Sequence, residues 1–224
     1  MLHRKTEPPL TRLALMALGC AGLLLCSAAA RAAECASLNL PRPIYGEGGS
    51  ATKPLIGKLA AALAAQPQPI TVLYKSPGAC FGYYDLVDGK KLSGGISYWD
   101  AAGKEQTCDL PIANGPAPDF AVMVNSHKLC AMASPTLPAD IGDFQGPVDA
   151  FTLFVPTSSP ATSISSEAAY FVYGFGKEGG VDPWIVDDSI IIKRDVNSAA
   201  ALYVALASGV PVAKLKGRDA GNNT

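Results

Sequence analysis

Histidine is nearly absent from this chain of 224 residues, which contains only His3 and His127. It also has no pair of cysteines at the C-x-x-C spacing that is typical of zinc sites, so a metal centre would lack its usual ligands. A Ser/His/Asp hydrolase would depend on His127 alone, and no G-x-S-x-G motif accompanies it. We therefore expect no metal, no cofactor and no enzymatic activity, with His127 at a strand end or on the surface. An extracytoplasmic hydrolase is the alternative.

Long hydrophobic runs are missing too. The longest, Leu13–Leu25, is too short to span a bilayer. It follows the basic residues Arg4, Lys5 and Arg12 and precedes an A-x-A cleavage site at Ala30–Ala32. This pattern predicts a signal peptide over residues 1–32 and a periplasmic mature protein without stable membrane insertion. A lipoprotein anchored through Cys20 is the alternative.

Positive charge is scarce after residue 32. Removing residues 1–32 takes away four cations and one anion, which leaves 14 Lys plus Arg against 18 Asp plus Glu, a net charge near −4. Nucleic acids and anionic membranes both require a basic face, so we expect neither as a partner. A small anion is not excluded, because backbone dipoles and one arginine are enough to hold it.

Four cysteines remain after residue 32: Cys35, Cys80, Cys108 and Cys130. An even count in an exported chain predicts two disulfides, with three pairings to consider. Cys80 and Cys130 each follow a predicted strand at one edge of the sheet, whereas Cys35 precedes the first strand, at the opposite edge, roughly 25 Å away. Cys35–Cys80 is thereby disfavoured. Of the remaining pairings we favour Cys80–Cys130 with Cys35–Cys108.

The stretch Ile44–Ala65 organises the chain. A predicted strand, Leu38–Ile44, runs into a glycine-rich turn with Gly46, Gly48 and Gly49, and a helix begins at once. Pro54 suits the first turn of that helix, and Ser50 or Thr52 can cap it. Its predicted apolar face consists of Leu55, Ile56, Leu59, Ala60 and Leu63. A strand, a glycine turn and a helix N-terminus together predict an anion site.

The same turn matches the G-x-G-x-x-G/A dinucleotide fingerprint at Gly46, Gly48 and Ala51. A dinucleotide site also needs an acidic residue about 20 residues later, at the end of the next strand. Lys75 and Ser76 occupy that place, so a dinucleotide cofactor is disfavoured. A plain turn between strand and helix without any ligand is the remaining alternative.

The strand, turn and helix pattern then repeats. Ile70–Tyr74 is a predicted strand, followed by a second glycine turn and a short helix around Tyr83–Val87. Asp119–Val124 is the third strand, after a segment, 88–118, that we expect to fold over the domain as an insertion stapled by Cys108. This repetition predicts an α/β fold with a parallel-rich sheet, whose ligands bind beyond the carboxyl ends of the strands.

The rest of the chain predicts a second lobe. Val148–Val155 is a continuous apolar run typical of a buried strand, and Ser165–Phe175 is a helix with apolar residues all round, which should be buried. Ile190–Ile192 is a predicted core strand. Asn197 and Ser198 then cap a helix from Ala199 to Ala207. We place the first lobe at 34–150 and a partial second lobe at 151–224.

The order of these segments resembles the phosphate-binding proteins of ABC transporters, in the type II periplasmic binding protein superfamily. The similarity covers about Leu38 to Gly217. It is carried by five segments: Tyr45–Ala51 (Y-G-E-G-G-S-A), Tyr74–Gly82 (Y-K-S-P-G-A-C-F-G), Asp119–Phe120, Ser165–Pro183 with its G-F-G-K and Trp184 just after it, and Arg194–Ala200 (R-D-V-N-S-A-A). The resemblance implies two lobes with a ligand between them. Family members extend beyond this point, so we expect an incomplete second lobe.

The resemblance also implies the ligand-binding residues. They are Gly49, Ser50, Ala51, Gly78, Ala79, Asn125, Arg194, Ser198 and Ala199. Three departures bear on the ligand: the binding serine of the second loop becomes Ala79, the S-D pair of the third segment has no clear match near Asn125, and Gly and Thr of the last loop become Ala199 and Ala200.

The resemblance implies a monomeric solute-binding protein that captures a small oxyanion, phosphate above others, and delivers it to an ABC permease. The family's aspartate accepts the proton that distinguishes phosphate from sulfate, so its loss bears on selectivity. The alternative is a periplasmic binding or sensory module with the same fold, a different ligand and no transport role. Arg194 is the residue that we most expect to bind the oxyanion. The alternative is that it forms a salt bridge with Asp195 or Glu178.

Overall fold

The computed structural model describes residues 32–130, 137–147, 150–184 and 191–220. Residues 33–224 form one compact unit. The predicted signal peptide lies outside the described residues, apart from Ala32. Among the helices of the described ranges, none is long and apolar enough to cross a membrane.

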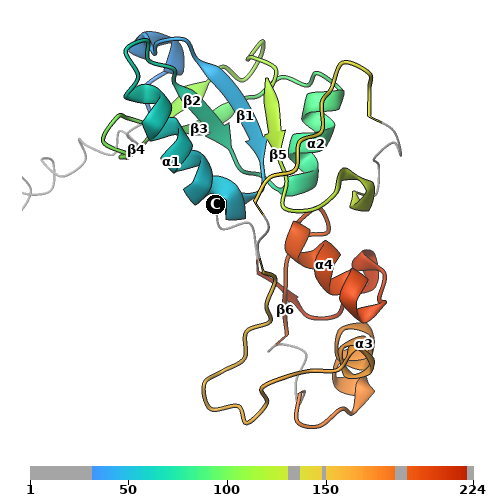
Figure 1. Cartoon of the computed structure of the whole chain (residues 1–224). Helices are drawn as coiled ribbons and strands as arrows, with labels where there is room; N and C mark the ends of the chain where they lie inside the picture. The colour runs from blue at the N-terminus through green and yellow to red at the C-terminus, as the bar shows by residue number, and fades with distance from the viewer. Residues whose placement is uncertain (1–31, 131–136, 148–149, 185–190, 221–224) are drawn as a thin grey trace, which may run out of the picture. The chain divides into compact units, whose positions relative to one another are not determined.

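A mixed five-stranded sheet forms the core of the unit (Figure 1). The strands are β1 (Ile44–Gly48), β2 (Val72–Lys75), β3 (Gly94–Trp99), β4 (Glu105–Leu110) and β5 (Phe120–Val122), in the order β4-β3-β2-β1-β5. Strand β1 pairs in parallel with both β2 and β5, whereas β3 is antiparallel to its two neighbours. The α/β class is confirmed, but two of the four strand pairs in this sheet are antiparallel.

The antiparallel pairs come from the segment 88–118. It forms the hairpin β3–β4, which adds to the free edge of β2. The prediction of an insertion folded over the domain is therefore wrong, because alternating apolar residues such as Ile96 and Cys108 let the segment continue the sheet and its core.

Strand β1 begins where the sequence suggested that the first strand would end. Gly46 and Gly48 lie inside it rather than in a turn. A Cβ on Gly46 would lie 2.2 Å from Cζ of Phe120, and one on Gly48 would lie 2.0 Å from the carbonyl oxygen of Val122. These glycines therefore allow β5 to approach closely, and only Gly49 begins the turn.

Helix α1 (Lys53–Ala64) follows the short 3₁₀ helix η2 (Ser50–Thr52) and covers one face of the sheet (Figure 1). Ile56 and Ala60 face Val72 and Tyr74 of β2. The predicted apolar face is partly wrong, because Leu55 and Leu59 are 47% and 51% exposed. The reason is the small residue Gly57, which lets the indole of Trp99 approach and turns the Ile56–Ala60 side towards the sheet.

Helix α2 (Ala79–Val87) covers the opposite face. It lies directly on β1, since a Cβ on Gly82 would be 2.5 Å from the carbonyl oxygen of Glu47. It also begins four residues earlier than the sequence indicated. The 3₁₀ helix η1 (Cys35–Leu38) packs on this side too, in a cluster with Leu73 of β2. The sheet is thus the middle layer of three.

Two disulfides join these layers, and they are the pairs favoured from the sequence. Cys35–Cys108 ties η1 to β4, and Cys80–Cys130 ties the first turn of α2 to the residue after the 3₁₀ helix η3 (His127–Leu129). Disulfides of this kind fit an exported protein.

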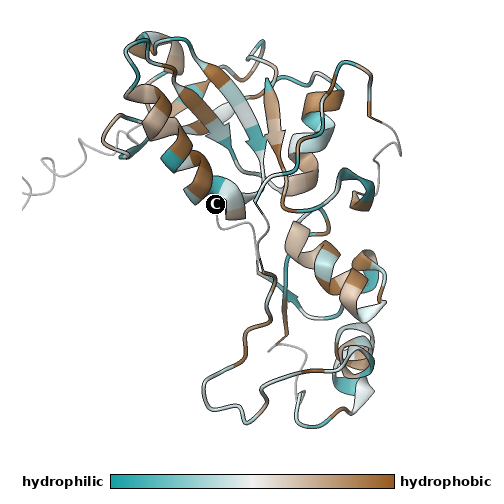
Figure 2. Ribbon diagram, in the orientation of Figure 1, coloured by the Kyte–Doolittle hydropathy of each residue, from teal (hydrophilic) through white to brown (hydrophobic). Residues whose placement is uncertain are grey.

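Residues 150–220 form shorter elements. They are α3 (Ser166–Phe175), η4 (Gly176–Gly179), β6 (Ile192–Lys193), α4 (Ala199–Ser208), η6 (Val212–Lys214) and β7 (Arg218–Asp219). Strands β6 and β7 pair in parallel as a small second sheet. Hydrophobic residues, which Figure 2 shows in brown, occur in α4 as well as in the main sheet.

Three predictions for this region are wrong. Of the predicted strand Val148–Val155, residues 150–155 form no strand and Phe154 is 94% exposed, because no strand of the described ranges pairs with them; residues 148–149 lie outside the described residues. Helix α3 buries only one side, through Ala169 and Val172, and its aromatic side chains remain partly exposed. The predicted core strand is reduced to β6, which exposes Ile192; Ile190 lies outside the described residues.

Candidate functional site

The first two predicted loops meet beyond the carboxyl end of β1. The amide of Gly49 donates to the carbonyl of Val122 (3.0 Å), and the amide of Gly78 donates to the carbonyl of Gly48 (3.2 Å). A Cβ on Gly49 would lie 3.8 Å from Cβ of Ala79. The first turns after β1 and β2 are therefore in contact, as the parallel pairing of these strands requires.

The last predicted loop, Arg194–Ala200, also reaches this place. The carbonyl of Asn197 accepts a hydrogen bond from the amide of Cys80 (3.3 Å), in the first turn of α2. Asp195 shapes the loop, because its carboxylate accepts from the Asn197 amide (2.9 Å) and its carbonyl accepts from the Ser198 amide (2.9 Å). Ala199 is buried and Ser198 is half-buried.

Two of the predicted helix-capping hydrogen bonds are not formed. Neither Ser198 at the start of α4 nor Thr52 at the start of α1 makes a side-chain capping bond. Ser50 and Ala51 are exposed. Within the described ranges, the Ser198 hydroxyl therefore does not cap α4.

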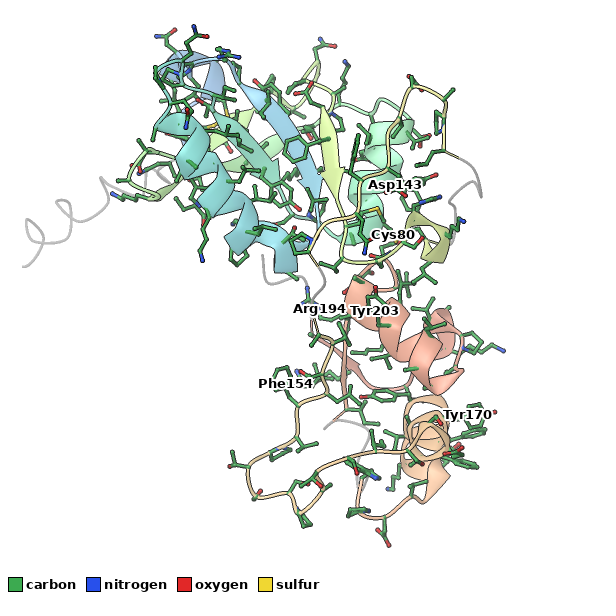
Figure 3. The ribbon with its side chains drawn as sticks, viewed as in Figure 1. Cys80, Asp143, Phe154, Tyr170, Arg194 and Tyr203 are labelled. Atoms are coloured by element: carbon green, nitrogen blue, oxygen red, sulfur yellow. A yellow bond between two sulfur atoms is a disulfide. The ribbon has the colours of Figure 1, made fainter. Side chains whose placement is uncertain are left out.

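Arg194 is the cation of this loop. It is half-buried, and its Nε atom is buried without a hydrogen-bond partner in the described part of the chain. Neither Asp195 nor Glu178, the two acids considered as salt-bridge partners, pairs with it. Figure 3 shows Arg194 on the segment that leads into the helix of Tyr203.

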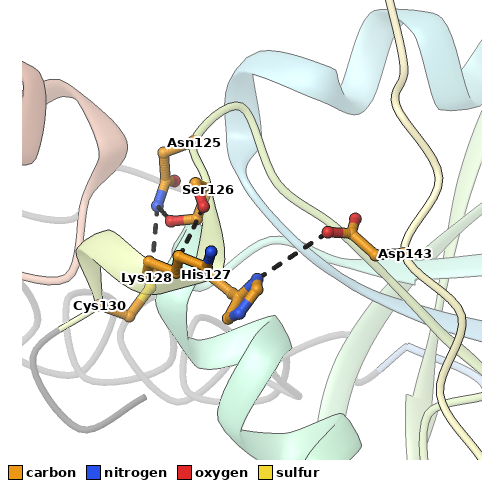
Figure 4. Close-up of polar contacts among 6 residues, drawn as sticks. All are labelled: Asn125, Ser126, His127, Lys128, Cys130 and Asp143. Atoms are coloured by element: carbon orange, nitrogen blue, oxygen red, sulfur yellow. Dashed lines mark hydrogen bonds and ion pairs between the residues drawn. The ribbon is translucent and has the colours of Figure 1, made fainter. Parts of the chain in front are cut away.

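Asn125 follows β5 and is 8% exposed. Its Nδ2 donates to the carbonyl of Ser126 (3.0 Å) and contacts Sγ of Cys130 (3.7 Å; Figure 4). These two acceptors fix the orientation of the amide and leave Oδ1 buried with no partner among the described residues. Tyr203 of α4 donates to the carbonyl of Val124 (2.8 Å), so α4 is tied to the residue before Asn125.

His127 is the first residue of η3, five residues after the end of β5, so it does not lie at the strand end itself. Its ring stacks on Tyr83 of α2, with 5.4 Å between the centroids, and its Nδ1 is 4.0 Å from Oδ2 of Asp143 (Figure 4). The Ser126 hydroxyl accepts from the amide of Lys128 (3.4 Å) and not from the imidazole. His127 therefore packs against α2, and no serine of the described ranges is hydrogen-bonded to its ring.

Glu47 is the residue that sequence reasoning missed. It is 2% exposed, in β1, and its side chain is directed towards Asp85 of α2. Burial, a hydrogen bond with Asp85 and the negative charge of Asp85 raise the pKa of Glu47 to about 8, although Lys75 and Lys90 oppose this shift. The signal was present, since an acid inside the short strand Ile44–Gly48 is unusual.

An open groove of about 500 Å³ lies next to Ser50, along α1. Lys53 and Lys58 line it together with Trp99. Lys53 is already paired with Glu105, with 2.7 Å between Nζ and Oε1. The groove is therefore less suited to an anion than the loops described above.

Metal ligands are scarce in this unit. All four cysteines after residue 32 are in disulfides, so none can serve as a thiolate. Over the ranges that the structure describes, no three His, Cys, Asp or Glu residues lie close enough together to hold a metal ion.

No protein-family model, curated protein or solved structure significantly matches this chain.

Proposed function

We propose that this protein captures a small oxyanion, phosphate above others, and releases it unchanged to an ABC permease. Residues 1–32 serve as its signal peptide, and residues 34–150 and 151–224 correspond to a first lobe and a partial second lobe of the type II periplasmic-binding fold. The motif resemblance supports the transport role and the two-lobe fold. The two disulfides support export to the periplasm.

Arg194 carries the proposal. A guanidinium nitrogen that is removed from water needs a partner, because burying an unpaired polar or charged group is costly. No side chain or carbonyl of the described residues supplies one to Nε. An oxyanion would satisfy the guanidinium with short, charge-assisted hydrogen bonds.

Backbone amides supply the other donors in this proposal. The amides of Ser50 and Ala51 have no acceptor within the described part of the chain, and they begin the helical segment that continues into α1. Amides at a helix start favour an anion through both hydrogen bonding and the helix dipole. The Ser198 hydroxyl adds a donor from the loop that carries Arg194.

Asn125 bears on which oxyanion binds. Its Oδ1 is a buried acceptor to which no donor of the described residues is hydrogen-bonded. An oxyanion that carries a proton, such as hydrogen phosphate, offers that donor, whereas sulfate offers none. Asn125 can therefore replace in part the acceptor that the family motif supplies through aspartate.

One contact favours the alternative, a binding or sensory module for another ligand. The carbonyl of Asn197 occupies the start of α2, where it accepts from the Cys80 amide. An anion bound at that amide would have to displace the carbonyl, and Ala79 offers no hydroxyl to help. If the protein is a module for another ligand, the turn of Gly78 and Ala79 does not contact that ligand.

Thermal unfolding tests the proposal directly. The oxidised protein, expressed as the full chain, is unfolded with and without millimolar phosphate, arsenate, sulfate and molybdate. A ligand at about 100 times its dissociation constant adds roughly 2.7 kcal/mol, so we expect phosphate to raise the melting temperature by several degrees. The Arg194→Ala variant should lose this increase.

Arg42→Ala is the matched control, since Arg42 is exposed and contacts only Gln68 among the described residues. It should keep the phosphate response. A cooperative transition that no oxyanion moves would refute oxyanion capture and favour the module for another ligand.

A further inference from the structure

Two buried hydroxyls converge on one carbonyl at the first loop. The Thr52 hydroxyl donates to the Gly49 carbonyl (2.7 Å), and the Tyr74 hydroxyl lies 3.0 Å from the same oxygen. The two hydroxyl oxygens are 2.9 Å apart. Burial raises the pKa of Tyr74 to about 12, so its phenol keeps the proton that it donates.

The two hydrogen bonds to the Gly49 carbonyl fix the direction of the Ser50 amide. In a trans peptide the C=O and the N–H point to opposite sides of one rigid plane. Because the Gly49 carbonyl is held against Thr52 and Tyr74, the Ser50 amide must point away from them. Gly49 is also fixed on its other side, since its own amide donates to the Val122 carbonyl (3.0 Å).

The hydroxyls are not needed to fill the core. Tyr74 packs its ring among apolar residues and stacks on Phe120, which phenylalanine could do equally well. Both hydroxyls instead meet at the carbonyl of Gly49, which precedes the amides of Ser50 and Ala51; these amides have no acceptor among the residues that the structure describes. The Asn125 side chain, buried with an unpartnered acceptor after the adjacent strand β5, is independent support for a ligand near this edge.

We propose that Tyr74 and Thr52 are positioning residues, whose hydroxyls hold the Gly49 carbonyl so that the Ser50 amide faces the bound oxyanion. This role rests on the proposed function. Neither side chain contacts the ligand; both act through the peptide between Gly49 and Ser50.

The test is calorimetric titration of inorganic phosphate into the full-length expressed, oxidised protein and its variants. Tyr74→Phe and Thr52→Val each remove one hydroxyl, and each should weaken phosphate binding about tenfold, since a hydrogen bond to a charged group is lost or misaligned. Thr52→Ser keeps the hydroxyl and should bind within about twofold of the wild type. In ¹⁵N spectra, phosphate should shift the Ser50 amide strongly in the wild type and weakly in Tyr74→Phe.

Val72→Ala is the control for stability. Val72 belongs to the same buried cluster as Tyr74 but has no hydroxyl, so its truncation should lower the midpoint of urea unfolding and leave phosphate affinity unchanged. If Val72→Ala weakens binding as much as Tyr74→Phe does, the hydroxyls act only through stability and the inference is overturned.

The remaining outcomes separate the two proposals. Wild-type affinity in Tyr74→Phe and Thr52→Val, with binding lost in Arg194→Ala, overturns the positioning role and supports oxyanion capture. A wild-type protein that binds no oxyanion overturns both.

Discussion

Glu47→Gln is the substitution whose effect on stability follows most directly from the structure. Glu47 is buried between β1 and α2, where its carboxyl group is hydrogen-bonded to Asp85. Lys90 is paired with Asp85 (3.1 Å), and Lys75 donates to the carbonyl of Ser93 (2.6 Å). No cation of the described residues therefore pairs with Glu47 itself. Glutamine keeps the shape of the side chain and a hydrogen bond to Asp85, but it has no charge to bury.

The pKa of Glu47 determines the sign of the effect. The folded protein holds the proton up to about pH 8, whereas the ordinary value is 4.5. Between these two values the unfolded chain binds fewer protons than the folded protein, so stability falls as the pH rises through this window. At pH 7 this corresponds to a loss on the order of 3 kcal/mol relative to pH 4. Glu47→Gln should avoid that loss.

Urea unfolding of both proteins between pH 4 and pH 8.5 measures the difference. We expect the two to be nearly equally stable at pH 4, and the variant to become progressively more stable up to about pH 8, with little further change. A difference that does not depend on pH would refute the reasoning, because Glu47 would then titrate alike in the folded and unfolded states.

Three further predictions follow from the fold. Replacing Cys80 and Cys130 by serine should lower the free energy of unfolding by about 4 kcal/mol in the chain-entropy model, since the bond closes a 50-residue loop, and urea unfolding measures this loss. Gly46→Ala should cost about 1–3 kcal/mol in the same assay, because the new methyl meets the ring of Phe120; an unchanged midpoint would contradict the packing of β5 on β1. Glu105→Gln should reduce stability at neutral pH and have no effect at acid pH, since hydrogen bonds from Lys53 and Ser97 lower the pKa of Glu105, and the stability that this carboxylate contributes is lost as the pH falls. A loss that persists at pH 3 would argue against that account.

The sequence predicted the elements whose apolar residues face a single partner. The strands near β1, β2 and β5 were found, and so were α1 and α4, because each buries one stripe against the core. The favoured pairing of the four cysteines is also confirmed; the strand ends disfavoured Cys35–Cys80, and the choice between the remaining pairings was a preference.

The errors share a physical cause. An apolar run such as 150–155 indicates burial only if a neighbouring strand or helix lies beside it, and a single segment carries no information about that neighbour. In the same way, Gly46 and Gly48 suggested a turn. They instead lie in β1, where the absence of a side chain lets β5, which is distant in sequence, approach closely. Tertiary contacts, rather than local preference, decided both cases.

For the candidate site, too, the sequence predicted the features that lie in local motifs and missed those that depend on tertiary contacts. The order of the loops and Arg194 could be predicted, because glycines, a cation and helix starts are visible in local motifs. Two other contacts could not be predicted: the hydrogen bond from α2 to the Asn197 carbonyl and the hydrogen bond from Tyr74 to the Gly49 carbonyl. Both join parts of the chain that meet only after folding.

Glu47 links the stability of the fold to the proposed ligand. It lies two residues before Gly49, so its carboxylate, once ionised, would add negative charge close to the loop that is proposed to hold an oxyanion. The ligand should therefore favour the protonated acid, and by linkage the affinity for the oxyanion should fall as Glu47 loses its proton. Glu47→Gln cannot ionise, so it should remove the part of the pH dependence of affinity that arises from this residue.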